Sequence, residues 1–253
     1  MIFWNIDWTE IFHLVFLRHL ESKLAKNLYA LKGGCNLRFF FKSIRYSEDI
    51  DFDVKTVAIE TLRAKVSKIL RSPPFEQTLR SHDIEISHLS ESKQTGTTQR
   101  WKLGLRVRGS TIALPTKIEF SRRKMEGKIV FEPVDPDLIR SYHLYPVMTN
   151  HYDLETAFRQ KIDALILRTG LQTRDIFDLK LLLERGADLK LISPYISKKI
   201  DLAIERIDEC HFSDFKGQVV AYLAFDYQNY YDSPKIWQSI QYTLINSLKT
   251  LKK

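Results

Sequence analysis

The run from Asp49 to Val54 constrains the fold of this 253-residue chain more than any other segment. Its aspartates alternate strictly with Ile50, Phe52 and Val54. In an extended strand, alternate residues point to opposite faces, so the aspartates share one face and the apolar residues share the other. The segment is therefore predicted to be a strand with one face in a core and one acidic face.

Such an acidic face needs a physical reason, because like charges on neighbouring positions of one strand face repel each other. A divalent cation bound by Asp49 and Asp51 would relieve the repulsion. Carboxylate oxygens are hard ligands that suit Mg²⁺ or Mn²⁺. A solvated edge strand that points its charges outward is the alternative.

A third carboxylate is usual where two metal ions assist phosphoryl transfer. Glu119 is the first candidate, because it lies on a later predicted strand and faces away from its apolar neighbours. Asp53 and Asp83 are rivals for this role. A cross-strand salt bridge from Glu119 to Lys102 or Arg106 is the competing interpretation.

Two glycines, Gly33 and Gly34, separate a short apolar run at 28–31 from a predicted helix that extends from Asn36 to about Lys42. Glycines let a backbone approach a triphosphate closely. The free amides of the helix N-terminus would point at the same phosphates. A tight turn with no ligand is the alternative.

The hydrophobic periodicity changes at about residue 148, which predicts an α+β fold with two domains at 1–148 and 149–253. In the first domain, the other expected elements are helices at 9–28 (with Thr9 as a cap) and 57–71, a polar turn at 91–99, and strands at 83–88, 100–108 and 117–121. In the second domain, the expected helices are 153–169, 173–185, 196–209, 214–224 and 234–252.

Composition narrows the choice of partners. The formal net charge is +8, which is compatible either with a merely soluble basic surface or with a polyanionic partner such as a nucleoside triphosphate or nucleic acid. The two cysteines, Cys35 and Cys210, have no metal or disulfide spacing and favour a reduced, cytoplasmic protein. No apolar stretch is long enough to cross a bilayer, so no membrane partner is expected.

Two separated motifs resemble one known family. The segments LKGG at 31–34 and SEDIDF at 47–52 are similar to those of the AbiEii/AbiGii toxin nucleotidyltransferases, which belong to the DNA polymerase beta-like superfamily. Downstream, KIDAL at 161–165, then Arg168, then RDIFDL at 174–179 resemble the family's lysine and Arg-Asp-x-x-Asp-Leu signature. The pair of motifs is far more specific than either one alone.

The resemblance implies a nucleotidyltransferase sheet flanked by helices and followed by a helical domain. It implies metal-dependent transfer of a nucleotide from a nucleoside triphosphate to an RNA end, the acceptor end of tRNA in characterised relatives. It also implies a toxin with a cognate antitoxin. Two alternatives remain open: transfer to a small-molecule acceptor, and an inactive module that binds RNA or a protein partner.

Both lines of reasoning together define the candidate site. The candidate catalytic residues are Asp49, Asp51, Glu119, Lys161, Asp175 and Asp178, and the candidate metal ligands are Asp49, Asp51 and Glu119. The candidate nucleotide-binding residues are Lys32, Gly33, Gly34, Cys35, Ser47, Lys161 and Arg174. In this interpretation Lys161 holds a triphosphate as a point charge, and the two downstream aspartates orient it.

Further residues carry weaker expectations. Cys35 stands where the family usually has a hydroxyl residue, and its weaker hydrogen bond is expected to lower phosphate affinity. An intrahelical ion pair between Arg174 and Asp178 is the alternative for that motif. The cluster Arg122, Arg123 and Lys124 is predicted to contact acceptor RNA, with a solvated turn as the alternative.

Some eye-catching residues are expected to be structural. His19 is predicted to be a core histidine with its hydrogen bonds satisfied. The aromatic residues between 222 and 237 are predicted to pack between the last two helices rather than to form a base-stacking platform.

Overall fold

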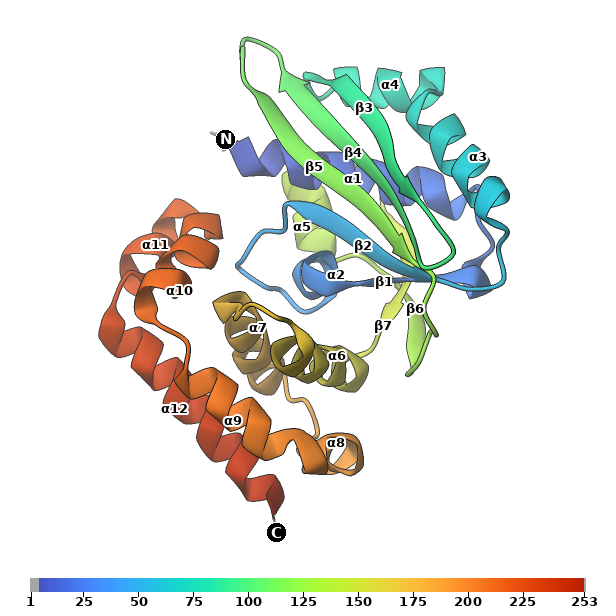
Figure 1. Ribbon diagram of the computed structural model, residues 1–253. Coiled ribbons are helices and arrows are strands. Elements are labelled where there is room, and N and C mark those ends of the chain that lie inside the picture. The colour runs from blue at the N-terminus through green and yellow to red at the C-terminus, as the bar shows by residue number, and fades with distance from the viewer. Residues whose placement is uncertain (1–4, 253) are drawn as a thin grey trace. The chain divides into compact units, whose positions relative to one another are not determined.

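The computed structural model describes residues 5–252 (Figure 1). The chain folds into two compact units. The first, here called the sheet unit, comprises the chain up to Phe40 and residues 46–152. The second, the helical unit, comprises residues 41–45 and 153–253. The second unit therefore begins after Tyr152 rather than after residue 148, and it includes a short segment from the first part of the chain.

The sheet unit is built on one mixed sheet of seven strands in the order β3-β4-β5-β2-β1-β7-β6. The strands are β1 (Tyr29–Lys32), β2 (Asp49–Val54), β3 (Ile84–Gln94), β4 (Thr98–Val107), β5 (Ala113–Ser121), β6 (Ile129–Pro133) and β7 (Met148–Tyr152). The central strand β2 pairs in parallel with β5 and antiparallel with β1. The predicted α+β class is confirmed.

Five α-helices belong to this unit: α1 (Asn5–Glu21), α2 (Gly33–Phe40), α3 (Ile59–Leu70), α4 (Pro73–Arg80) and α5 (Pro136–Ser141). A single turn of 3-10 helix at Lys26–Leu28 precedes β1. Thr9 lies inside α1, so its predicted role as the cap of that helix is wrong. Helix α3 ends at Leu70, close to the predicted end at residue 71. Pro73 and Pro74 begin α4, because proline is well tolerated in the first helical turn.

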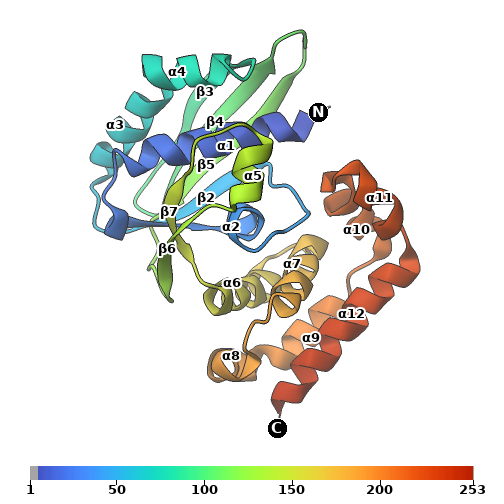
Figure 2. The same cartoon turned by 180° about the vertical axis from the view of Figure 1, so that it is seen from behind.

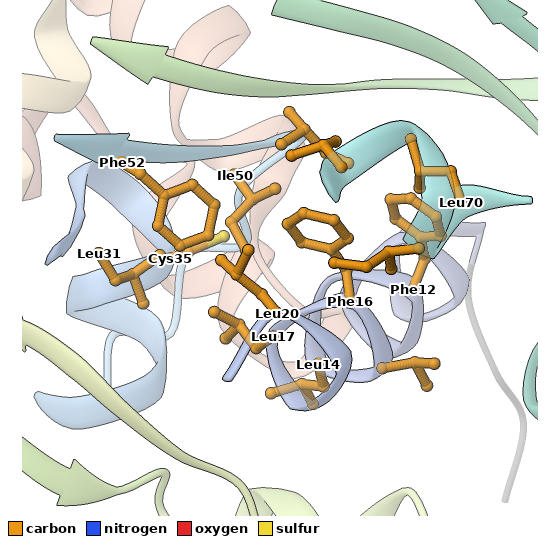
Figure 3. Packing of buried hydrophobic residues seen from close by; sticks show 14 of the residues in the cluster. Phe12, Leu14, Phe16, Leu17, Leu20, Leu31, Cys35, Ile50, Phe52 and Leu70 are labelled. Carbon is orange, nitrogen blue, oxygen red and sulfur yellow. The ribbon is translucent and has the colours of Figure 1, made fainter. Parts of the chain in front are cut away.

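The core of the sheet unit lies between α1 and the apolar face of β2. Phe52 packs beside Phe16 of α1, with ring centroids 6.2 Å apart, and stacks on Phe120 of β5 at 4.7 Å. Figure 3 shows Phe16, Ile50 and Phe52 among the other buried side chains of this cluster. Burying each such aromatic ring contributes roughly 1.5–3 kcal/mol. The acidic face of β2 consequently points away from α1.

The helical unit contains seven α-helices: α6 (Leu154–Leu167), α7 (Thr173–Glu184), α8 (Leu189–Ile196), α9 (Ile200–Asp208), α10 (Phe212–Gln218), α11 (Phe225–Tyr231) and α12 (Pro234–Lys249). They can be followed in Figure 2. Phe215 of α10 stacks on Trp237 of α12 at 4.5 Å between ring centroids. Both side chains are buried, which anchors the last helix to its own unit.

Several elements differ from the sequence prediction. Much of the predicted polar turn at 91–99 is strand, because β3 and β4 pair with each other as far as Gln94 and Gln99. The strands β6 and β7 and the helices α5, α8 and α11 were not predicted, since these short segments lack a clear hydrophobic period. Among the described residues, no helix is long and apolar enough to cross a membrane.

The aromatic residues of α11 are mostly exposed. Trp237 is buried and Tyr231 contacts Phe177 edge-to-face, as packing requires. Phe225, Tyr227 and Tyr230, however, keep 56%, 45% and 61% of their surface exposed. The predicted packing of the aromatic series is therefore wrong for these three side chains.

Candidate active site

The acidic face of β2 lies in the middle of the sheet, where two of its aspartates meet charged partners on β5. Asp49 lies opposite Lys117, and Asp51 lies opposite Glu119, in the parallel register of the two strands. All four side chains are partly buried. The sheet thus places the three carboxylates that the sequence suggests as metal ligands on two paired strands, β2 and β5.

These carboxylates differ in their counterions. Lys117 places its Nζ 2.7 Å from Asp49 Oδ2. Arg100 of β4 places a guanidinium nitrogen 2.6 Å from Glu119 Oε2. Asp51, by contrast, has no ion pair and no side-chain hydrogen bond within the described residues. Of the three carboxylates, Asp51 is therefore the one available to bind a ligand.

The electrostatics of Asp51 reflect this position. Burial raises the pKa of its carboxyl group, and the neighbouring charges of Asp49 and Glu119 raise it further, while Lys117 and Lys32 oppose the change. A raised carboxyl pKa means that the ionised form is destabilised by its surroundings. A cation placed beside Asp51 would reverse this effect.

Gly33 closes one side of the site. Its φ of +69° lies in the left-handed region, and a Cβ atom there would stand 3.1 Å from Asp51 Oδ2. Any other residue would be strained and would crowd this carboxylate. Helix α2 begins at Gly33, not at Asn36 as predicted. The amides without helical acceptors are therefore those of the glycine pair and the residues just after it.

Lys32 and Asp53 bind each other on the neighbouring strands. Lys32 Nζ lies 2.5 Å from Asp53 Oδ1, and the hydroxyl of Tyr152 donates to Asp53 Oδ2 at 2.7 Å. Asp53 is buried, so its charge is already used within the fold. The other rival for the third carboxylate, Asp83, precedes edge strand β3, which β4 and β5 separate from β2.

Cys35 and Ser47 both fix the beginning of β2. The Cys35 thiol donates to the carbonyl oxygen of Asp49 at 3.2 Å, and the Ser47 hydroxyl donates to the same atom at 2.9 Å. The thiol is buried in the core (Figure 3), and burial together with the charge of Asp51 raises its pKa. In this arrangement the thiol positions the carboxylate strand.

The donor chemistry of Asp49 and Asp51 fits a divalent cation, since both offer oxygen ligands and Asp51 lacks a counterion within the described chain. Within residues 5–252, however, no three His, Cys, Asp or Glu side chains are grouped closely enough to hold a metal ion. Glu119 is held by Arg100 instead. Both contacts that Arg100 makes with Glu119 go to Oε2, so a ligand role of Glu119 would fall to its other oxygen or require the arginine to move.

The second motif forms a buried ionic cluster in the helical unit. Lys161 of α6 places its Nζ 2.9 Å from Asp175 Oδ1 and 2.6 Å from Asp178 Oδ2 on α7. Arg45 binds Asp178 in a bidentate manner, with contacts of 2.9–3.2 Å. Both aspartates have 0% of their surface exposed. Burial opposes ionisation of Asp178, but Arg45 and Lys161 outweigh it and lower the pKa of that carboxyl group.

Two arginines of the motif have different surroundings. Arg168 Nε lies 3.5 Å from Asp175 Oδ2, an oxygen that accepts no hydrogen bond from the described residues. Arg174 makes no ion pair within the part of the chain that the structure describes. The alternative of an intrahelical pair between Arg174 and Asp178 is therefore wrong, because Asp178 faces Lys161 and Arg45.

Arg45 is the residue that sequence reasoning missed in this cluster. It lies 133 residues from Asp178 in the chain and in no recognisable motif. Its backbone also pairs with Leu223 in an isolated antiparallel bridge. Only correlated variation between distant positions of related sequences could have identified Arg45 as a partner of Asp178.

The basic cluster after β5 is partly occupied by the fold. Arg122 donates to Gln99 Oε1 at 2.8 Å and to the carbonyl oxygen of Val57. Lys124 lies 2.8 Å from Glu126. Arg122 thus serves the packing of the sheet unit, whereas Lys124 lies on the surface.

Solved structures from two bacteria share this fold. The JHP933 protein from Helicobacter pylori superposes with a TM-score of 0.55 at 15% identity, over 100% of this chain and 94% of that one. MenT4, a nucleotidyltransferase toxin from Mycobacterium tuberculosis, superposes with a TM-score of 0.62 at 16% identity, over 98% of this chain and 94% of that one. At these identities the likeness concerns the fold.

The family follows from the sequence profile described as "Nucleotidyl transferase AbiEii toxin, Type IV TA system", which matches residues 15–223. The match covers most of the chain, and the chain belongs to this family of toxin nucleotidyltransferases, as its motifs predict. No curated protein sequence matches it.

Proposed function

We propose that this toxin transfers a nucleotide from a nucleoside triphosphate to the 3' end of an RNA, with tRNA as the acceptor, and that Asp49 and Asp51 hold two Mg²⁺ or Mn²⁺ ions for the reaction. The observation that carries the proposal is Asp51 itself. It is partly buried beside two other carboxylates and has no counterion within residues 5–252. A fold retains such a charge where a ligand neutralises it.

When bound, the metal ions supply electrostatic stabilisation of the attacking and leaving oxygens. The remaining work falls to the chain's own groups, which position the triphosphate. The first amides of α2 and the close approach allowed by Gly33 suit phosphate oxygens. In this proposal Glu119 becomes a third ligand through the carboxylate oxygen that Arg100 does not contact.

We assign nucleotide binding in the helical unit to Lys161 and Arg174, and the orientation of Lys161 to Asp175 and Asp178. Two carboxylates hold the Lys161 ammonium at 2.6–2.9 Å. A point charge fixed in this way cannot drift between rotamers, which favours a single binding geometry. Arg174, which has no partner of its own among the described residues, is available for a phosphate group.

The charge of the open sheet face favours a polyanionic acceptor. Lys102 occupies the same cross-strand row as Asp49, with Lys117 between them. Arg106 lies four residues further along β4, about 13 Å away. Lys102 and Arg106 are exposed and have no ion pair within residues 5–252. An RNA strand extends this far from a reacting 3' end, whereas a small polycationic acceptor would be repelled.

The cluster of Arg122, Arg123 and Lys124 remains part of the proposed RNA-binding surface, with one change. Arg122 is bound by the fold, so its removal would disturb the sheet unit itself. The RNA contacts are therefore tested on Arg123 and Lys124, together with Lys102. Neutralising these three should flatten the dependence of log affinity on log salt by about 0.7 for each phosphate of a single-stranded RNA that the variant no longer neutralises.

The deciding experiment incubates the protein with total RNA and each labelled nucleoside triphosphate in turn, and then sequences the labelled species. Label at tRNA 3' ends that requires Mg²⁺ or Mn²⁺ is the expected result. The Asp49→Ala/Asp51→Ala variant is the matched control. Label on small molecules alone, or none with any triphosphate, contradicts the proposal.

The family's toxin–antitoxin description supports a cognate antitoxin as a partner. We propose that the toxin acts in the cytoplasm. Expression of the toxin alone should arrest cell growth, and co-expression of the antitoxin should reverse the arrest. Growth curves with and without co-expression of a candidate antitoxin, using the wild type and the Asp49→Ala/Asp51→Ala variant, test this. Equal growth inhibition by both variants would show that toxicity does not arise from transfer.

A further inference from the structure

A cavity of about 610 Å³ lies in the sheet unit, between α1, α4 and the segment that connects α5 to β7. These elements can be followed in Figure 2. A cavity of this size falls within the range of pockets that hold small molecules, roughly 300–1,000 Å³. Its apolar wall includes Leu14, Val15 and Leu144.

The polar lining of this cavity is basic or neutral throughout the described residues. Arg18, His19, His82 and His143 line it together with several hydroxyl groups, and no carboxylate of residues 5–252 does. Arg18 has no ion pair within the same residues, and its guanidinium lies 4.4 Å from the ring centroid of Tyr145. An arginine stacked in this way keeps its N–H donors free for a ligand.

Two histidines add to the positive character of this lining. Burial lowers the pKa of His82, and the nearby His143 lowers it further, while Asp83, which does not line the cavity, opposes the change. An anion between them would stabilise the protonated rings. Imidazolium and guanidinium groups bind phosphate and carboxylate by charge-assisted hydrogen bonds.

The position of the cavity separates it from the proposed active site. Helix α1 packs on the face of β2 that carries Ile50 and Phe52, as the contact of Phe16 with Phe52 shows. Asp49 and Asp51 point to the opposite face. A ligand in the cavity therefore does not occupy the place of the reacting triphosphate.

We propose that this cavity is a second binding site, which takes a small organic anion: an apolar or aromatic body that carries a phosphate or a carboxylate. The body lies against Leu14, Val15 and Leu144. The anionic group lies among Arg18, His82 and His143. The site exists whether or not the carboxylates of β2 transfer nucleotides to RNA.

The test is an NMR titration of the full-length protein that follows the imidazole resonances of His19, His82 and His143. Phenyl phosphate and benzoate are the two anionic probes, and benzyl alcohol is the neutral control. Saturable shifts of these three rings with either anion, and none with benzyl alcohol, are expected. The tighter of the two anions identifies the charged group. Equal binding of the alcohol, or no saturable shift at these rings, overturns the proposal.

Two variants localise the binding. Arg18→Gln should weaken the tighter anion about tenfold, because one charge-assisted hydrogen bond is removed. Arg80→Gln on α4 removes the same charge from a residue that does not line the cavity, and its affinity should match the wild type. Thr78→Trp, which fills the cavity, should abolish binding even if Arg18→Gln does not fold. Unchanged affinity in folded Arg18→Gln or Thr78→Trp contradicts the site.

Discussion

Two aspartates, Asp51 in the sheet unit and Asp178 in the helical unit, carry the same charge in opposite circumstances. Asp51 is partly exposed, has like charges beside it and has no counterion within the described chain. Asp178 is fully buried and is bound by both Arg45 and Lys161. The pKa of Asp51 is raised, and that of Asp178 is lowered.

The difference separates charges that are kept for a ligand from charges that the fold itself uses. An ionised Asp51 destabilises its own surroundings, so local stability gives no reason for its presence. Asp178 is neutralised within the helical unit, and its removal would take the bidentate partner from Arg45 and one of two carboxylates from Lys161. Chemistry is therefore expected to depend most on the first residue, and stability most on the second.

The largest expected effect comes from removing the β2 carboxylates. Asp49→Ala/Asp51→Ala should lower nucleotidyl transfer by about a thousandfold or more, because groups that stabilise transition-state charge typically have effects of this size. The free energy of unfolding should fall by no more than about 1 kcal/mol, since relief of like-charge repulsion offsets the loss of the partly exposed Asp49–Lys117 ion pair. Single-turnover rates and urea denaturation measure the two quantities. An Asp137→Ala control removes an exposed aspartate and should leave the rate unchanged.

The next effect concerns stability in the helical unit. Asp178→Ala should lower the free energy of unfolding by about 3–5 kcal/mol, because it breaks a buried ionic cluster by removing the carboxylate that binds both Arg45 and Lys161. Urea denaturation gives the value. Asp163→Ala, which breaks an exposed pair with Lys199, should cost at most about 1 kcal/mol. If the two variants were equally stable, Asp178 would not have the structural role inferred here.

A third prediction concerns metal binding. Mg²⁺ at about one hundred times its dissociation constant should stabilise the wild type by about 2.7 kcal/mol, because it binds only the folded state. The Asp49→Ala/Asp51→Ala variant should show no such gain. Thermal unfolding with Mg²⁺ and with EDTA provides the comparison. Equal stabilisation of both proteins would place the metal elsewhere.

The smallest effect is the opposite pH dependence of the two aspartates in the metal-free chain. The raised pKa of Asp51 means that its contribution to stability is present below the unfolded pKa of about 3.9 and is lost as pH rises through the folded value. The lowered pKa of Asp178 means that its contribution is present above about 3.9 and is lost as pH falls through its folded value.

Substitution by asparagine should remove each dependence separately. Asp51→Asn should abolish the loss on raising the pH, and Asp178→Asn the loss on lowering it, by about 1.4 kcal/mol for each unit of pKa difference. Unfolding free energies measured in EDTA between acid and neutral pH test the sign. If both substitutions changed the pH dependence of the unfolding free energy in the same direction, the distinction between the two residues would not hold.

Local sequence patterns predicted those helices and strands that are specified by a few consecutive residues. The alternation of residues 49–54 specified β2 and its two faces, and the glycine pair located the turn into α2. The exact start of α2 was missed, because the left-handed φ of Gly33 already belongs to the helix boundary. Strand β7 was missed because its buried residues include polar Thr149, Asn150 and His151.

The partners of the charged groups depend on contacts between distant positions, which one sequence does not reveal. Glu119 was expected to be free for a metal, but Arg100 lies directly opposite it on β4. The sequence suggested Lys102 or Arg106 for this pairing, and the register of β4 with β5 selects Arg100. Asp178 likewise takes Arg45 rather than its helical neighbour Arg174.

The five residues from Phe41 to Arg45 belong to the helical unit, although the chain on both sides of them belongs to the sheet unit. No single cut can therefore separate the two units. A fragment that ends at Tyr152 would retain Arg45 without Asp178, the carboxylate that it binds in a bidentate manner. The helical unit cannot be exchanged between relatives as a C-terminal module alone; a working chimera must transfer residues 41–45 from the same parent.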